Sequence, residues 1–153
     1  MKLKNYTSGV PVERTVARIE QILAEFGAKA IGKNYEAGKL VSLTFQLEIN
    51  QRDVLIRLPA NPKAVYDAML KDVAPPVTKR YPRESTIQKI AQQSDRTAWK
   101  IQQEWLEIEL TKIKLGQTAP LQAFLSYVWD GRQTYYDCLE HGGFKGLLLE
   151  DKK

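Results

Sequence analysis

The sequence predicts an α+β protein, with an N-terminal α-β-β-β-α unit, a three-stranded antiparallel sheet, and a helical C-terminal half with one long helix. Two observations predict this class. Apolar residues alternate with polar ones from Val41 to Ile49, which is the period of a strand with one buried face. Apolar residues also recur three and four apart between Ile87 and Leu115, which is the period of an amphipathic helix.

The first half of the chain is expected to contain a helix, three strands and a second helix. Proline suits a first helical turn and Gly27 suits the position after a helix, so the first helix has clear ends. Short polar turns separate the strands, which favours hairpins. The expected elements are residues 11–26 (helix), 28–36, 41–49 and 54–58 (strands) and 61–72 (helix).

The second half is expected to be helical. Ser85 begins a Ser-x-x-Gln pattern of the capping-box type, so we expect it to cap the long helix, which ends at Gly116. Large apolar residues concentrate in Trp99–Ile113, so this part of the helix should be buried on a broad face. Two shorter helices are expected to follow, one over residues 118–128 and a last one that stops at Gly142.

The chain divides into residues 1–72, a proline-rich basic connector over residues 73–84, and a helical unit over residues 85–153. With 153 residues and 43% apolar residues, the two units are expected to share one core as a single compact domain. No apolar run approaches the roughly 20 residues that span a bilayer, and the start does not have the pattern of a signal peptide. The single cysteine, Cys138, excludes an intramolecular disulfide and favours the cytoplasm.

Positive charge is concentrated in the middle of the chain. The net charge is +5, and residues 73–100 contain six basic and two acidic residues. Three of these cations recur seven and four residues apart, on one helical face. The other three precede the positive end of the helix dipole, where a bound phosphate would offset their repulsion. The predicted nucleic-acid-binding residues are Lys79, Arg80 and Arg83 in the connector and Lys89, Arg96 and Lys100 on the helix. The alternative is a solvated surface with a chance excess of cations.

No motif predicts an enzyme. Residues 27–34, GAKAIGKN, nearly match a phosphate-binding loop, but they lack its final hydroxyl and follow a helix. The only histidine, His141, has no recognisable nucleophile beside it and suits a helix C-terminus. One histidine and one cysteine cannot build a zinc site. Glu104, Glu107 and Glu109 lack the histidine partner of di-metal bundles and should be solvated. We expect no metal and no cofactor.

Aromatic residues are dense near the end of the chain, and most of them are expected to belong to the core. Tyr127 and Trp129, just before the Asp130-Gly131 turn, are expected to be exposed and are the predicted partner-binding residues. They motivate a second hypothesis, a protein-interaction module or an inhibitor of a host enzyme or defence complex. Its partner would be a host protein with an acidic face, or a second copy joined through the long helix.

Long segments of the chain resemble one family. RTAWKIQQEWLEIELTKIKLG with PLQAFLSYVWDGRQTYYDCLE, and TSGVPVERTVARIEQILAEFGA with GKLVSLTFQLEI, are similar to small phage and prophage proteins that have no established activity. The resemblance implies a phage context and no catalytic residues. The α-β-β-β-α order of residues 11–72 also resembles the double-stranded RNA-binding domain, whose lysine-rich second helix is matched only by Lys63. We therefore expect a non-enzymatic phage-type protein that binds DNA or RNA through its basic middle segment.

Overall fold

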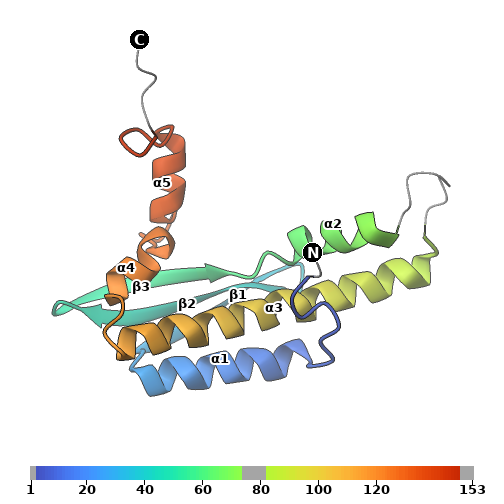
Figure 1. Cartoon of the computed structure of the whole chain (residues 1–153), viewed down its shortest axis with the longest axis horizontal. Coiled ribbons are helices and arrows are strands. Elements are labelled where there is room, and N and C mark those ends of the chain that lie inside the picture. Colours follow the sequence, from blue (N-terminus) through green and yellow to red (C-terminus); the bar gives the residue numbers. More distant parts are fainter. Residues whose placement is uncertain (1–2, 74–81, 149–153) are drawn as a thin grey trace, which may run out of the picture.

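The computed structural model describes residues 3–73 and 82–148. Figure 1 shows a body of sheet and helices from which the C-terminal segment projects. The predicted α+β class, with a three-stranded antiparallel sheet and a long helix in the second half, is confirmed. None of the helices in the described ranges is long and apolar enough to cross a membrane. The elements are α1 (Val12–Phe26), β1 (Ala30–Glu36), β2 (Lys39–Ile49), β3 (Arg52–Pro59), α2 (Pro62–Val73), α3 (Glu84–Lys114), α4 (Pro120–Phe124), the 3-10 helix η1 (Leu125–Tyr127) and α5 (Tyr135–His141).

Two tight turns set the register of the sheet, whose strand order is β1-β2-β3. Both residues of each turn, 37–38 and 50–51, have positive φ values between 49° and 78°. Positive φ at both central residues is the hairpin pattern whose twist matches that of paired strands. As a result, Phe45 at the centre of β2 lies opposite Ile31 on β1 and Ile56 on β3. These apolar side chains point to the same face of the sheet.

One hydrophobic core joins the segments on the two sides of the connector. Helices α1 and α3 run side by side along one face of the sheet (Figure 1). Trp99 and Leu106 of α3 are 1% and 0% exposed, as predicted, whereas Ile108 in the same half of the helix is 58% exposed, so the buried face is narrower than the sequence indicates. The buried core residues are Val16, Ile19, Leu23, Leu43, Phe45, Leu47, Ile56, Leu58, Ala60, Ala98, Trp99, Leu106, Leu110 and Phe124.

The long helix α3 begins earlier than the capping box predicts. Its N-cap residue is Arg83, whose carbonyl accepts hydrogen bonds from the Thr86 and Ile87 amides, and no side chain caps this end. The prediction that Ser85 is the cap is therefore wrong. Glu84 occupies the first turn, where a carboxylate is favourable near the positive end of the helix dipole and supports the earlier start.

The prediction of one continuous helix over residues 118–128 is wrong after Phe124. Helix α4 ends at Phe124 and gives way to η1, after which Val128 forms an antiparallel bridge with Ile56 of β3. The Trp129 amide donates to the Leu55 carbonyl at 2.9 Å. The outer edge of β3 offers backbone groups that need partners, and pairing with them competes with continuation of the helix.

Residues 135–148, which follow the bridge to β3, form an arm. Figure 1 shows α5 projecting steeply from the body. Thr134 caps α5, because its hydroxyl accepts from the Asp137 amide at 3.2 Å while its own amide donates to the Asp137 carboxylate at 3.0 Å. The helix gives way at Gly142, as predicted. Seven residues are too few for a helix to be stable by itself in water, so its cap and its contacts with η1 matter for its stability.

Candidate functional site

A groove lies where α2, α3 and the N-terminal segment meet. Its volume is about 440 Å³. The N-terminal segment contributes Tyr6, and α2 contributes Met69 and Asp72. One face of the N-terminal half of α3 supplies most of the remaining lining, including Lys89, Ile90, Gln93 and Arg96. We call this feature the α2/α3 groove.

Two cations of the groove have no carboxylate partner in the described part of the chain. Lys89 and Arg96 lie on one face of α3, because seven residues make nearly two helical turns. In residues 3–73 and 82–148 neither forms an ion pair, whereas a lysine of the body such as Lys33 pairs with Glu20 at 2.7 Å. Among the described residues, Asp72 is the one carboxylate that lines the groove with them. The groove therefore has a positive balance that an anion would complement.

The N-terminal segment is held on α3 by the side chains of one buried and one half-buried residue. The hydroxyl of Thr97, which is 0% exposed, donates to the Asn5 carbonyl at 2.9 Å. The side-chain amide of Gln93 donates to the Ser8 carbonyl at 2.9 Å. These two bonds hold the backbone on both sides of Tyr6, whose side chain is 51% exposed. Polar residues at inward positions of α3 thus place an aromatic ring at the groove.

Glu104 lies about two helical turns beyond Thr97 on α3 and also holds the N-terminal segment. Its carboxylate accepts from the Asn5 side-chain amide at 3.0 Å and pairs with the Lys4 ammonium at 3.0 Å. The hydrogen bond from Asn5, followed by the bond and charge of Lys4, holds the pKa of Glu104 below its ordinary value of 4.5. The ionised carboxylate is therefore the form that fits the folded chain.

Acid is expected to loosen the N-terminal segment. Because the folded pKa of Glu104 is lowered, its contribution to stability is fully present above the ordinary value of 4.5 and is lost as the pH falls through the folded value. The protection factors of the amides at residues 5–8, which compare each exchange rate with its intrinsic value at the same pH, should fall in that range. In Glu104→Gln the pH-dependent step should be absent; an unchanged step in this variant would assign the effect to another group.

The structure brings together part of the predicted basic cluster. Lys89 and Arg96 line the α2/α3 groove. Lys100 lies about one turn further along α3, outside the groove lining. Arg83 is exposed at the N-cap position of α3 and does not line the groove either. The two remaining predicted cations, Lys79 and Arg80, lie outside the described residues.

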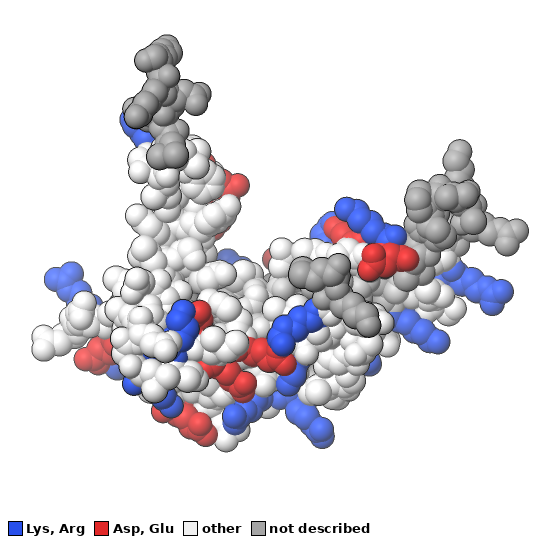
Figure 2. Space-filling view, viewed as in Figure 1, with Lys and Arg blue, Asp and Glu red and all other residues white. Residues whose placement is uncertain are grey.

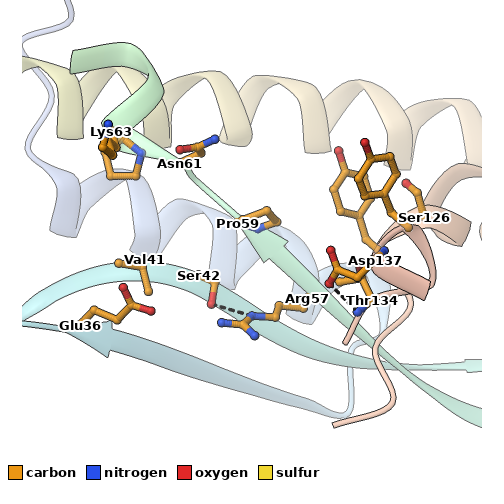
Figure 3. A pocket seen from close by; sticks show the side chains of 13 residues that line it. Glu36, Val41, Ser42, Arg57, Pro59, Asn61, Lys63, Ser126, Thr134 and Asp137 are labelled. Atoms are coloured by element: carbon orange, nitrogen blue, oxygen red, sulfur yellow. Dashed lines mark hydrogen bonds between the residues drawn. The ribbon is translucent and has the colours of Figure 1, made fainter. Parts of the chain in front are cut away.

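A larger cleft of about 640 Å³ lies between the sheet, the start of α2 and the arm. Figure 3 shows its side chains converging from these three places. Ser42 and Arg57 come from the face of the sheet that α1 and α3 leave open. Asn61 comes from the chain before α2, Thr134 lies just before the arm, and Asp137 belongs to the first turn of the arm. We call this feature the arm cleft.

Arg57 is the best-positioned cation of the arm cleft. Its Nε donates to the Ser42 hydroxyl at 3.2 Å, and Ser42 is only 1% exposed. The guanidinium carbon lies 5.6 Å from the centre of the Trp129 ring, a cation–π arrangement. Within the described ranges Arg57 forms no ion pair, although Glu36 and Asp137 also line the cleft. Its guanidinium is thus oriented before any ligand arrives.

The two predicted partner-binding aromatic residues are half-buried rather than exposed. The Tyr127 ring packs edge-to-face on Trp105, with centroids 5.5 Å apart, and Trp129 lies against the guanidinium described above. The bridge between Val128 and Ile56 of β3 brings both rings onto the body, which the local sequence does not indicate. The exposed rings of this region are Tyr135 and Tyr136 on α5, at 42% and 48%.

The near match to a phosphate-binding loop does not form a loop. Gly27 ends α1 with φ 112°, and the chain from Ala30 onward belongs to β1. His141 lies at the end of α5, where its Nδ1 is 3.2 Å from the Gln133 side-chain oxygen. Among the residues that the structure describes, no group of three histidine, cysteine or acidic side chains could hold a metal ion.

Comparisons with protein-family models, with curated proteins and with solved structures give no match for this chain. The functional argument therefore rests on the α2/α3 groove and the arm cleft themselves.

Proposed function

We propose that this chain is a non-enzymatic, phage-type protein that binds nucleic acid through the α2/α3 groove and the adjoining face of α3. The observation that supports this most strongly is the pair Lys89 and Arg96, which line one groove without a carboxylate partner in the described residues. Uncompensated cations gathered in a concave surface raise the local concentration of a polyanion. Phosphates supply that charge along a nucleic-acid chain.

The spacing of the cations fits a ligand with repeated charges. Lys89 and Arg96 are separated by about 10 Å along the axis of α3, and Lys100 adds about 6 Å more. A single small anion does not span this distance, whereas successive phosphates of one strand do. Figure 2 shows basic side chains, mixed with a few acidic ones, standing out where α2 and α3 meet.

The first experiment is a binding titration with labelled oligonucleotides across a salt series. Binding through phosphates releases counterions, so the logarithm of the affinity should fall linearly as the logarithm of the salt concentration rises. A binding that does not weaken between about 50 and 200 mM salt would overturn the proposal, as would the absence of binding.

Asp72→Asn is expected to tighten binding. Asp72 is the carboxylate of the α2/α3 groove and repels phosphates there, so its neutralisation should raise the affinity up to about fivefold. The measurement is the same titration at low salt. A gain in affinity cannot result from unfolding of the variant, so this result would be specific to the lost carboxylate. Asp53→Asn, at an exposed position of the sheet, is the control and should leave the affinity nearly unchanged.

A second candidate function is the docking of an acidic protein segment in the arm cleft. The orientation of Arg57 by Ser42 and Trp129 favours it, because a fixed guanidinium binds a carboxylate at little entropic cost. Binding of acidic peptides should be lost in Arg57→Gln and kept in Lys89→Gln. The reverse pattern would show that the peptides bind in the α2/α3 groove. A separate light-scattering measurement would detect binding of a second copy of the chain.

A further inference from the structure

We infer that the α2/α3 groove binds single-stranded nucleic acid, with one unstacked base lying on the Tyr6 ring and the flanking phosphates on Lys89 and Arg96. This inference rests on the proposed nucleic-acid binding and narrows it to one substrate class. Three features of the groove support it: the position of Tyr6, the apolar residues of the lining, and the two cations that line the same groove.

Tyr6 is an exposed ring on an anchored backbone. Asn5 has a φ of 60° and its carbonyl accepts from the Ser8 amide at 3.0 Å, so residues 5–8 form a tight turn. Thr97 and Gln93 hold the two ends of this turn on α3. An exposed aromatic ring that is placed in this way offers a flat stacking surface, and the backbone that carries it loses little freedom on binding.

The other walls of the groove suit the chemistry of a base. Met69 and Ile90 line the same groove as Tyr6 and are nearly buried, at 7% and 8% exposed, so they form an apolar floor of small accessible area. Gln92 is exposed at the groove and brings an amide group that can bond to the polar edge of a base. The groove volume of about 440 Å³ lies in the range of sites that enclose a small organic group.

These features favour a single strand over a duplex. A duplex presents its phosphates on the outside and keeps its bases stacked. Cations alone can therefore bind its backbone, and an apolar groove with an aromatic ring adds no contact to a stacked base. A base enters a groove only after it has left the stack, which costs energy in a duplex and far less in a single strand. Aromatic rings that stack bases beside cations are the usual elements of single-strand binding.

The test compares Tyr6→Ala with the parent chain on three oligonucleotides: a single strand, the matching duplex and an abasic single strand. Tyr6→Ala should weaken binding of the normal single strand by about five- to hundredfold and leave binding of the abasic strand unchanged. Tyr6→Phe, which keeps the ring, should bind like the parent. The control is Tyr35→Ala, which removes a ring that is 60% exposed on β1 outside the groove.

The outcomes separate this inference from the proposed function. If the parent chain binds the duplex as tightly as the single strand and Tyr6→Ala changes neither, the single-strand inference is wrong while nucleic-acid binding stands. An equal loss of binding to the abasic strand in Tyr6→Ala would also contradict stacking. If no oligonucleotide binds in a salt-dependent way, the proposed function fails as well. Because the Tyr6 side chain is half exposed, thermal unfolding should show that Tyr6→Ala remains folded.

Discussion

Replacing Lys89 and Arg96 together with glutamine is expected to weaken the binding of a single strand by about ten- to hundredfold at about 50 mM salt. Each of the two residues is placed to neutralise one phosphate. When that contact is lost, the phosphate keeps its counterion, and the favourable entropy of counterion release no longer contributes to binding. The slope of the logarithm of affinity against the logarithm of salt should also become shallower by about 1.4, or about 0.7 for each contact. Fluorescence anisotropy across a salt series measures both quantities.

The matched control is Arg132→Gln with Lys145→Gln. This pair also consists of one arginine and one lysine, both exposed, and lies around the arm outside the α2/α3 groove. It lowers the net charge of +5 by the same two units. If the control variant loses as much affinity and slope as the groove variant, binding depends on net charge alone and the groove has no special role.

Phe124→Ala is expected to lower the free energy of unfolding by about 3–5 kcal/mol. Phe124 is 0% exposed and packs edge-to-face on Phe45 of β2 and Trp105 of α3, with centroids 5.7 and 6.0 Å away. It therefore joins α4 to the sheet and to the long helix at one point. Removal of the ring loses its burial and leaves a cavity that these rigid elements cannot close.

Urea denaturation followed by circular dichroism measures this loss as a lower transition midpoint. Leu121→Ala is the control on the same short helix, because Leu121 is 37% exposed and its truncation should cost about 1 kcal/mol or less. Equal losses in the two variants would contradict the assignment of Phe124 to the shared core.

The elements that the sequence predicts well are those defined by their own residues. The alternation in β2 and the short turns at 37–38 and 50–51 determine the sheet, because a strand with one buried face needs only its period and its turns. The same holds for Lys89 and Arg96, whose common face follows from their spacing on a helix.

The features that the sequence does not predict depend on contacts between distant residues. Tyr6 has no periodic pattern around it, and it matters because Thr97 bonds to Asn5 across 92 positions. Trp129 resembles an exposed residue before a turn, until the bridge to β3 places it against Arg57. Propensity and pattern describe neighbours along the chain, whereas these two placements come from tertiary structure.

The most direct test of nucleic-acid binding at the α2/α3 groove is a titration of the ¹⁵N-labelled protein with a single-stranded oligonucleotide, followed by NMR. The largest amide shifts should fall on Tyr6 and on the groove face of α3 around Lys89 and Arg96, with little change at Arg57 or along α5. Shifts that centre on the arm cleft, or that spread evenly over the basic residues of the body, would contradict the account.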